Sequence, residues 1–528
     1  WRERDKPNTS LSTESMMQQI CASCVVGRVV GAASVAIRRP LHYYQRNQRL
    51  RRRLSAVPAS SSLAAALPHL AVSTNPYDLE SHGKGESYHP TARPFAVVTP
   101  KDVNEVVDVV RYCNEHKVPL IPYGAGTSCE GHLSAISSKG SISLDMTKLD
   151  SIELSDDPLA TVGAGVTRMR LNQELRHSGL HFVVDPGADA TLGGMVACGA
   201  SGTTAVQYGT MRENILGLTC VLPDGTVAHC GGKALKSSAG YDLTSLMTGS
   251  EGTLGVITSV TVKLHPLPAH VVAGICIFED LHSAAEAVAA LKYCSIPLAR
   301  CELLDATSIK AFNRYNKQMR SSEMQEKPTL FLEFQGPSEA AVQEQVAMTE
   351  SICTSPDYGG SNFSYTSGEE ERKALWSARH SLLYASIALR PGATHALITD
   401  ACVPLSKFSD LISATAQSVE EQDVVGPCFG HAGDGNFHCI LPMADSDSDD
   451  YIRRLHHVND TLIQGALAAG GTCTGEHGVG YGKIKYLEQQ YGSGAVEMMK
   501  LLKRAFDPNN IMNPGKVVAV SDDDGVPP

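Results

Sequence analysis

Three glycine-rich segments follow one another in the first half of the chain, and they constrain its fold more than any other feature. Their sequences are PYGAGTSCEGH (residues 122–132), VDPGADATLGGMVACGASG (184–202) and GSEGTLGVIT (249–258). Glycine permits positive φ angles and leaves no side chain in the way, so several backbone N–H groups of such a loop can point at one anion. Three of these segments predict a long ligand that lies against the backbone at many points.

A Rossmann-type dinucleotide site is the alternative interpretation of the first segment. Gly124 and Gly126 fit a G-x-G pattern after a buried strand, and Asp145 lies about where a ribose-binding acid would stand. Cys129, however, occupies the position of the third glycine, and no amphipathic helix begins there. We therefore do not favour a Rossmann fold.

The length and composition predict a globular protein of more than one domain. With 528 residues, the chain exceeds the size of about 250–300 residues at which a single hydrophobic core stops growing. The net charge of −11 argues against a broad nucleic-acid-binding surface, so we expect no nucleic-acid partner. The 15 cysteines follow no regular framework, which favours reduced thiols over a disulfide scaffold.

The N-terminal region differs from the rest of the chain. No acidic residue occurs between Ser15 and Tyr77, and the same stretch is rich in arginine and serine. This composition is typical of a mitochondrial or plastid transit peptide, with a disordered basic tail as the alternative. We expect a leader over residues 1–70, cleaved between about residues 50 and 70. The apolar run from Val25 to Ile37 is interrupted by Arg28 and is shorter than the roughly 20 residues that span a bilayer, so we expect no transmembrane segment.

Strands and helices alternate through the remainder. In residues 90–268 we expect strands at 95–99, 118–124 and 141–146, with an amphipathic helix at 101–116. The prolines of PLPAHV (266–271) mark a boundary, after which residues 270–518 form a second domain. There, helices at 284–293 and 340–353 flank a strand at 328–336, and a long helix is expected at 368–389.

The segment GHAGDGNFH (430–438) predicts a β-hairpin that carries two histidines. Asp434-Gly435 is a strong signal for a two-residue type I′ turn, which would place His431 directly opposite His438, with Cβ atoms about 4.5–5.5 Å apart. Glu476, in TGEHG, can add an oxygen ligand. Three protein ligands with one open position suit a catalytic metal, and this donor set accepts Zn²⁺, Mn²⁺ or Fe²⁺. The alternative is two histidines on a polar sheet face.

These motifs together resemble a known flavoprotein family. The glycine segments, with YGTMRENIL (208–216) and LPDGTV (222–227), resemble the FAD-binding domain of the vanillyl-alcohol oxidase and p-cresol methylhydroxylase superfamily. GHAGDGNFH, CTGEHGVG (473–480) and MNPGK (512–516) resemble its D-lactate and D-2-hydroxyglutarate dehydrogenase branch, most closely the mitochondrial FAD-linked D-lactate dehydrogenases. The resemblance covers roughly residues 75–518.

The resemblance implies an α+β fold and a mitochondrial location. A two-part FAD-binding domain of the p-cresol methylhydroxylase type (90–268) would precede an α/β substrate-binding cap domain with an antiparallel sheet and a C-terminal helical segment (270–518). FAD would be bound in an extended form and non-covalently, although His132 lies in the first loop. The FAD pyrophosphate would lie on Gly124, Gly126, Thr127 and Ser128. The remaining FAD-binding positions would be Gly131, His132, Pro186, Gly193, Gly194, Ser201, Gly202, Glu251, Gly252, Ile257 and Asn513.

The resemblance also assigns roles in the second half of the chain. His431, His438 and Glu476 match the ligands of a divalent metal, Zn or Mn, and His477 matches the catalytic base that removes the substrate's hydroxyl proton. Arg379 matches the arginine that binds the substrate carboxylate, and a planar guanidinium suits that ion. Ile440 stands where an asparagine often follows the hairpin in the hydroxyglutarate relatives, which disfavours a substrate with two carboxylates.

The implied activity is oxidation of D-lactate and related D-2-hydroxy acids to pyruvate and 2-oxo acids. D-2-hydroxyglutarate and glycolate dehydrogenases of the same family are the alternatives. No CxxCH haem motif occurs, so we expect the electrons to pass to another molecule such as cytochrome c, an electron-transfer flavoprotein or a quinone, with a peripheral inner-membrane association left open. A metallohydrolase, a net non-redox ether-lipid synthase and a non-catalytic FAD-binding protein remain as other classes.

Overall fold

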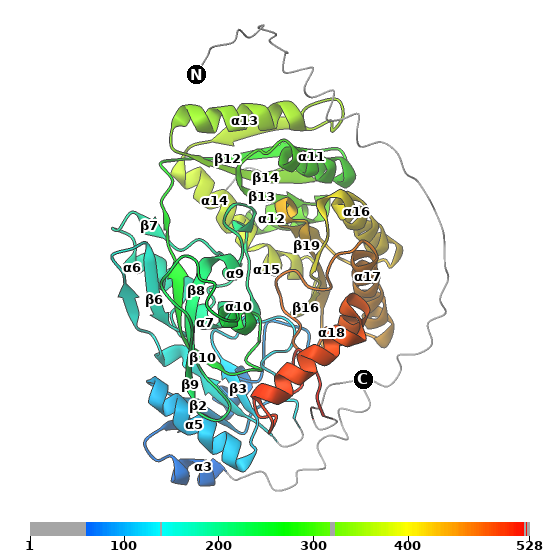
Figure 1. Cartoon of the computed structure of the whole chain (residues 1–528). Helices are drawn as coiled ribbons and strands as arrows, with labels where there is room; N and C mark the ends of the chain where they lie inside the picture. Colours follow the sequence, from blue (N-terminus) through cyan, green and yellow to red (C-terminus); the bar gives the residue numbers. More distant parts are fainter. Residues whose placement is uncertain (1–59, 138–139, 317–322, 522–523, 525–528) are drawn as a thin grey trace. The chain divides into compact units, whose positions relative to one another are not determined.

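The computed structural model describes residues 60–137, 140–316, 323–521 and 524. Most of the expected leader, residues 1–59, therefore lies outside the described residues. The described part has the mixed α and β architecture that the sequence predicts, with two larger sheets in the first half and a large antiparallel sheet in the second (Figure 1). A small two-stranded sheet pairs β7 (Leu180–His181) with β11 (His265–Pro266). None of the helices in the described part is long and apolar enough to cross a membrane.

The first sheet has four strands in the order β1-β2-β4-β3. β1 pairs antiparallel with β2, and the other pairs are parallel. Helix α5 makes the crossover from β2 to β3. It begins at Asp102, whose side chain accepts the N–H groups of Asn104 and Glu105, and it ends at Lys117 with a φ of 54°. Its apolar face, the one predicted from the sequence, is buried. The bounds are β1 (Ala71–Ser73), β2 (Ala96–Thr99), α5 (Val103–His116), β3 (Leu120–Tyr123) and β4 (Ile142–Asp145).

The second sheet is antiparallel, with five strands in the order β5-β6-β10-β8-β9. The second glycine segment contains the short helix α7 (Leu192–Cys198), and the Thr191 side chain caps its N-terminus. The core of the second sheet is a separate apolar cluster around strands β6, β8 and β10. The strands are β5 (Ile152–Leu154), β6 (Leu159–Gly163), β8 (Ile215–Val221), β9 (Val227–Gly231) and β10 (Val256–Lys263).

The third sheet lies in the second half and has eight antiparallel strands. The path is β15-β12-β14-β13-β18-β19-β16, and β17 pairs with β19. Strand β13 lies in the middle, between β14 and the hairpin β18–β19, and pairs with both β14 and β18. The strands are β12 (His270–Ile277), β13 (Leu298–Leu304), β14 (Thr329–Gly336), β15 (Ser361–Thr366), β16 (His395–Ile398), β17 (Ala401–Cys402), β18 (Cys428–Gly430) and β19 (Asn436–Met443).

Helices cover both faces of the third sheet. One apolar cluster joins the sheet to α11, α13, α16 and α17, and a smaller cluster joins it to α12, α14 and α15. Figure 1 shows α11 and α13 next to β12 and β14. The helices are α11 (Leu281–Tyr293), α12 (Ala306–Asn316), α13 (Glu339–Cys353), α14 (Glu369–His380), α15 (Leu382–Ile387), α16 (Leu405–Glu421), α17 (Asp449–Ala468) and α18 (Ile484–Phe506).

Two expectations about local structure were wrong. The long helix at 368–389 is divided into α14 and α15 at Ser381, whose hydroxyl donates to the carbonyl of Ser377 at 2.9 Å. The end of the expected leader is ordered, because Ser60–Ala66 forms helix α3 and buries Leu63 in the core of the first sheet. Hydrophobic burial of Leu63 makes this helix part of the folded protein.

The C-terminal segment is tied to the first half by a buried lysine. Lys503 of α18 donates to Asp507 at 2.5 Å, to the Thr253 carbonyl at 2.9 Å and to the Met512 carbonyl at 2.6 Å, and its side chain is 2% exposed. Asp507 also accepts the Met512 N–H at 2.7 Å. One ammonium group therefore fixes the path of the chain after α18.

We expect Lys503→Met to destabilise the protein by about 3–5 kcal/mol, since it leaves Asp507 buried without its partner. Thermal unfolding of the purified protein measures this as a lowered Tm. Lys500→Met is the matched control, because Lys500 is partly exposed on the same helix and should change the Tm little. Equal melting temperatures for the two variants would contradict the structural role of Lys503.

Candidate active site

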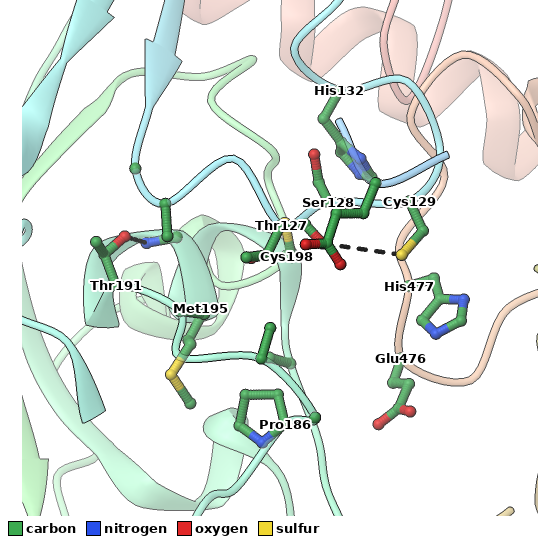
Figure 2. Close-up of a pocket in the computed structure, with 18 of the residues that line it drawn as sticks. Thr127, Ser128, Cys129, His132, Pro186, Thr191, Met195, Cys198, Glu476 and His477 are labelled. Atoms are coloured by element: carbon green, nitrogen blue, oxygen red, sulfur yellow. Dashed lines mark hydrogen bonds between the residues drawn. The ribbon is translucent and has the colours of Figure 1, made fainter. Parts of the chain in front are cut away.

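One cavity of 310 Å³ collects residues from both halves of the chain. The three glycine segments line it on one side, and α14, α15, the histidine hairpin and the GEHG segment line it on the other. Figure 2 shows Thr127 and Ser128 of the first segment and Pro186 and Thr191 of the second, with Glu476 and His477 across the cavity. The cavity is therefore shared between the predicted cofactor loops and the predicted catalytic residues.

The first glycine segment offers unpaired polar groups to this cavity. Within the described residues, the backbone N–H groups of Ala125, Gly126, Thr127 and Ser128 donate to no other backbone or side-chain group. The Ser128 hydroxyl is also buried without a hydrogen-bond partner. Ala125 is exposed and Gly126 to Ser128 are partly exposed, so these consecutive N–H groups are open to a ligand in the cavity and fit an anion such as a pyrophosphate.

Most of the predicted FAD-binding residues line the cavity. They are Gly124, Gly126, Thr127, Ser128, His132, Pro186, Gly193, Gly194, Ser201, Glu251, Gly252, Ile257 and Asn513. Gly131 and Gly202 are not among the described residues that line it, and their part in FAD binding stays a prediction. A Cβ at Gly131 would lie 2.2 Å from the Tyr481 ring, and one at Gly202 would lie 2.4 Å from the Asp185 carbonyl oxygen. These two glycines permit close packing of the surrounding chain.

Glu251 has a contact that the sequence does not predict. Its carboxylate accepts the N–H groups of Val479 at 2.6 Å and Gly480 at 2.8 Å, and it lies 2.9 Å from Nε2 of His132. The Glu251 carbonyl accepts the Asn513 side-chain amide at 2.8 Å. The third glycine segment thus holds the chain that follows His477, and it joins the two halves of the cavity.

The hairpin forms, but its predicted turn is wrong. Phe429 pairs with His438, so the register differs by two residues from the prediction, and the loop has four residues, Ala432–Gly435. A type I′ turn needs positive φ at both central residues, whereas only Gly435 has it, at 74°. Gly433 packs closely on Val206, where a Cβ would lie 2.6 Å from its side chain, so burial of the turn overrides the local signal.

The two histidines converge on one carboxylate despite the different register. A shift of two residues leaves each strand side chain on the same face of the sheet. Nε2 of His431 and Nε2 of His438 each lie 3.1 Å from the same oxygen of Glu476. One ligand atom from each of the three residues lies within 4.8 Å of the others, and all three line the cavity. The geometry fits a divalent metal site, and the metal role of these residues stays a prediction.

The far nitrogens of both histidines are fixed by protein acceptors. Nδ1 of His431 lies 2.6 Å from Glu302, and Nδ1 of His438 lies 3.1 Å from the Thr399 carbonyl oxygen. A metal-binding histidine usually donates its other ring N–H to such an acceptor, which orients the ring and fixes its tautomer. The same acceptors here direct the two Nε2 atoms toward Glu476.

Glu302 of β13 connects the histidine hairpin to Arg379. One oxygen contacts His431, and the other accepts from Nε of Arg379 at 2.8 Å and lies 2.5 Å from its Nη2. Burial alone would raise the pKa of Glu302, but Arg379 and His431 lower it to about 2. Arg379 is itself 6% exposed and lies over the Phe429 ring. One edge of the guanidinium is therefore occupied, and Nη1 remains for a ligand in the cavity.

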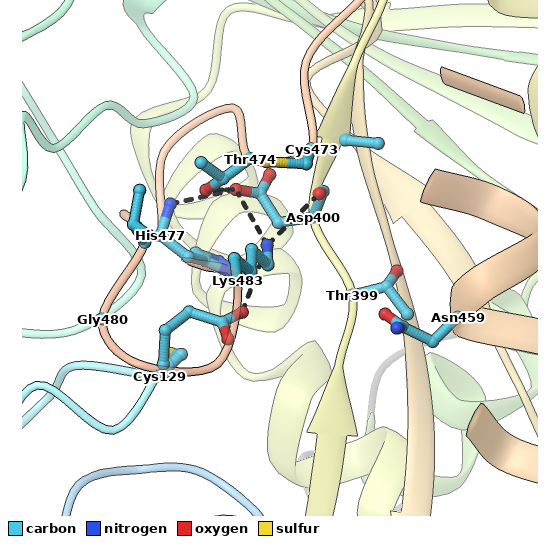
Figure 3. A network of polar contacts seen from close by, with 12 residues as sticks. Cys129, Thr399, Asp400, Asn459, Cys473, Thr474, His477, Gly480 and Lys483 are labelled. Atoms are coloured by element: carbon cyan, nitrogen blue, oxygen red, sulfur yellow. Dashed lines mark hydrogen bonds and ion pairs between the residues drawn. The ribbon is translucent and has the colours of Figure 1, made fainter. Parts of the chain in front are cut away.

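Asp400 holds the GEHG segment in place (Figure 3). Its Oδ2 accepts the N–H groups of Gly475, Glu476 and His477 at 2.7, 2.9 and 3.0 Å, and the Thr474 hydroxyl at 2.7 Å. Burial would raise the pKa of Asp400, but nearby His477 and Lys483 hold it well below its ordinary value. Because these donors already occupy Oδ2, we do not interpret Asp400 as a metal ligand.

His477 faces the cavity beside the proposed metal ligands. Its ring stacks on His438, with centroids 4.8 Å apart and planes within 11°. Nδ1 of His477 is buried and has no hydrogen-bond partner in the described part of the chain. Burial lowers the pKa of His477, and Asp400 partly offsets this effect. A neutral ring with one free nitrogen in the cavity can accept a proton from a bound ligand.

Sequence reasoning missed Glu302 and Asp400. Each is an acidic residue next to or within an apolar strand, in LARCELL (298–304) and HALITD (395–400), and each is fully buried. Charged residues are seldom buried unless they are paired, so such a position is the available signal. The identity of the partner is not encoded locally, because Asp400 binds residues about 75 positions later.

Comparisons with known proteins identify the family of this chain. Residues 94–231 match the family model of an FAD binding domain, and residues 267–517 match the C-terminal domain of FAD linked oxidases. The chain is 43% identical to a probable mitochondrial D-lactate dehydrogenase of Danio rerio, covering 89% of this chain and 94% of the relative. It is 42% identical to the mitochondrial D-lactate dehydrogenase [cytochrome] of Arabidopsis thaliana, covering 83% and 76%.

Two solved structures share the fold at low sequence identity. A substrate-bound p-cresol methylhydroxylase has a TM-score of 0.69 at 18% identity, covering 88% of this chain and 96% of that one. The 4-ethylphenol oxidase of Gulosibacter chungangensis has a TM-score of 0.71 at 17% identity, covering 89% and 98%. The fold and the cofactor loops define a flavoprotein of this architecture. The chain belongs to the FAD-linked oxidases, the family that includes the mitochondrial D-lactate dehydrogenases.

We expect Asp400→Asn to release the GEHG segment. In the native protein, Oδ1 of Asp400 also accepts the Asn436 side-chain amide at 2.8 Å. An asparagine at position 400 has only one oxygen, so it loses either the contact with the three N–H groups or the contact with Asn436. A hydrogen bond to a charged group contributes about 1.5–3 kcal/mol, so amide hydrogen exchange over residues 475–477 should accelerate at least about tenfold. Asp445→Asn is the control, since that side chain is 95% exposed. Unchanged exchange at Glu476 and His477 in Asp400→Asn would refute this role.

Proposed function

We propose that this protein is an FAD-dependent dehydrogenase that oxidises D-lactate to pyruvate. The observation that carries the proposal is that one cavity joins the glycine loops to Arg379, His477 and the His431–His438–Glu476 cluster. The relatives named as D-lactate dehydrogenases support the choice of substrate. The proposal includes a cofactor-binding domain over residues 90–268 and a substrate-binding domain over residues 270–518.

The glycine segments would hold FAD. The free N–H groups from Ala125 to Ser128 suit its pyrophosphate, and the segments around Gly193 and Gly252 suit the remainder of an extended ligand. Bound FAD supplies the two-electron redox chemistry that no side chain provides. The proposal keeps the FAD non-covalently bound, with Nε2 of His132 at 2.9 Å from Glu251.

We further propose that His431, His438 and Glu476 bind a divalent metal, Zn²⁺ or Mn²⁺. Two imidazoles and one carboxylate suit such ions, and the acceptors behind both histidines support the assignment. The metal would supply Lewis acidity to the substrate's oxygens. Glu302 would keep His431 oriented through its contact of 2.6 Å.

Arg379 would bind the carboxylate of the substrate. Glu302 holds one edge of the guanidinium, so the group is fixed before substrate arrives, and Nη1 remains free for a carboxylate oxygen. Charge-assisted hydrogen bonds of this kind give both orientation and affinity. The apolar Phe429 ring under the guanidinium excludes water from its face.

His477 would accept the hydroxyl proton of the substrate. The residue is held from two sides, because Asp400 binds its N–H at 3.0 Å and Glu251 binds the N–H of Val479. Its buried Nδ1 lacks a protein partner and is available for the proton. A base in this position suits the removal of a proton near neutral pH.

A mitochondrial location and a separate electron acceptor complete the proposal. Several relatives are named as mitochondrial enzymes, and the arginine-rich sequence from Ser15 to residue 60, which has no acidic residue, is typical of a transit peptide. Helix α3 is packed in the core, so we place the cleavage before Ser60. The acceptor would be cytochrome c, an electron-transfer flavoprotein or a quinone.

The test is an anaerobic titration of the purified yellow protein with D-lactate and with L-lactate. We expect D-lactate to bleach the flavin absorbance and L-lactate to leave it unchanged, because Arg379, His477 and the cofactor face the substrate from fixed directions. Purified protein without flavin would refute the cofactor. Protein that is yellow but not bleached by any D-2-hydroxy acid would refute the activity.

Variants of Arg379 and His477 should fail in different ways. We expect Arg379→Lys to raise KM by more than about tenfold, because one ammonium cannot serve both Glu302 and the substrate. We expect His477→Ala to lower the limiting rate of flavin reduction by about 10²–10⁴-fold while an unreactive carboxylate such as oxalate still binds. Single-turnover reduction against D-lactate concentration separates the two effects. If His477→Ala reduced its flavin at the wild-type limiting rate, His477 would not be the base.

Removal of metal should stop turnover without removing flavin. We expect dialysis against a chelator to abolish D-lactate oxidation and to leave the flavin absorbance intact, since different segments hold the two groups. Re-addition of Zn²⁺ or Mn²⁺ should restore activity in the wild type and not in His438→Ala. Metal content and rate equal to wild type in His438→Ala would exclude the proposed ligand set.

A further inference from the structure

A segment upstream of the first sheet reaches the active-site cavity. Glu86 lines the same cavity as Arg379, His477 and Tyr384, although it lies more than 290 residues before each of them in the sequence. It belongs to the stretch HGKGESYHP (82–90), which carries none of the motifs described above. The proposed reaction assigns no role to this carboxylate.

The position of Glu86 is fixed by contacts on both sides of it in the chain. The His82 ring lies 4.0 Å from the Tyr123 ring, and the His89 ring lies 4.5 Å from the Tyr481 ring. Gly85 lies directly on the first glycine segment, since a Cβ there would come within 2.4 Å of the Ser128 carbonyl oxygen. The carboxylate is therefore presented to the cavity by an anchored stretch of chain.

The charge of Glu86 has no cationic partner in the described part of the protein. The Tyr384 hydroxyl, on α15, donates to its Oε1 at 3.2 Å, and no lysine, arginine or histidine forms an ion pair with it there. Burial raises the pKa of Glu86, and the Tyr384 hydrogen bond opposes this. A pH of about 8 lies far above the ordinary pKa range of a glutamate and therefore favours the charged form of the group.

The described lining of the cavity offers a second carboxylate no arginine or lysine of its own. Of the described residues that line it, Arg379 is the only arginine or lysine. The lining also includes the apolar side chains of Leu383, Ile398 and Ile440. A substrate with one carboxylate can place that group on Arg379 and its side chain against these apolar side chains. A second carboxylate would meet the like charge of Glu86 in a partly desolvated space, where repulsion is stronger than in water.

We infer that Glu86 is a specificity-determining residue that excludes D-2-hydroxy acids with a second carboxylate and restricts the enzyme to monocarboxylic substrates. This inference rests on the proposed oxidation of D-2-hydroxy acids. It deepens that proposal by naming the substrate class and the residue that selects it. Tyr384 positions the carboxylate and does not carry the discrimination itself.

The test compares two substrates of equal carbon number, D-2-hydroxyvalerate and D-2-hydroxyglutarate, at pH 8. The measured quantity is the ratio of their kcat/KM values, taken with the flavin-loaded enzyme. We expect the wild type to favour the monocarboxylate strongly. Glu86→Gln, which keeps the shape and can still accept from Tyr384, should raise the relative kcat/KM for hydroxyglutarate by about tenfold or more. Glu86→Ala should change the ratio in the same direction, which keeps the test open if Glu86→Gln folds poorly.

Tyr384→Phe is the matched control, because it removes the hydrogen bond and keeps the charge. Its ratio should stay close to the wild-type value. A wild-type enzyme that oxidises both substrates equally, or a ratio unchanged in Glu86→Gln and Glu86→Ala, would overturn the inference. In either case, bleaching by D-lactate would leave the proposed function intact, whereas no bleaching by any D-2-hydroxy acid would refute the proposed function itself.

Discussion

The arrangement of the active-site cavity depends on the buried carboxylate of Asp400. One oxygen accepts three consecutive N–H groups and a hydroxyl from residues 474–477, and the other accepts the Asn436 amide from the histidine hairpin. The carboxylate therefore sets the position of Glu476 and His477 relative to His438. A buried charge of this kind is costly unless every lone pair is used, so the same contacts that stabilise it also define one geometry.

Other buried charges extend this constraint to the rest of the cavity. Lys483 lies 3.1 Å from Glu130 of the first glycine segment and 3.9 Å from Asp400, as Figure 3 illustrates for Asp400 and Lys483. Glu251, in the third glycine segment, binds the N–H groups just after His477. The loops that suit a cofactor and the loop that carries the proposed base are thereby held together by directional contacts. Displacement of either one would leave charges buried without partners.

The sequence predicts the local structure where periodicity or packing is strong. The apolar spacing of α5 and the buried run of β3 give these elements directly, and the order of the glycine segments indicates the loops that we propose to bind the cofactor. The turn at Asp434-Gly435 was predicted wrongly because Gly433 is buried against Val206, a contact that no local pattern encodes. Glu302 and Asp400 were missed for the same reason, since their partners lie far away in the sequence. The convergence of His431 and His438 was predicted correctly, because a register shift of two residues preserves the face.

The central claim is that the glycine loops and the histidine cluster form one site around one substrate. A crystal structure of the flavin-loaded protein with pyruvate tests it most directly. The account predicts that flavin and pyruvate occupy the same cavity, with the pyruvate carboxylate at about 2.7–3.2 Å from Arg379 and its C2 oxygen beside His477. Flavin bound outside the glycine loops, or a carboxylate bound away from Arg379, would contradict the account.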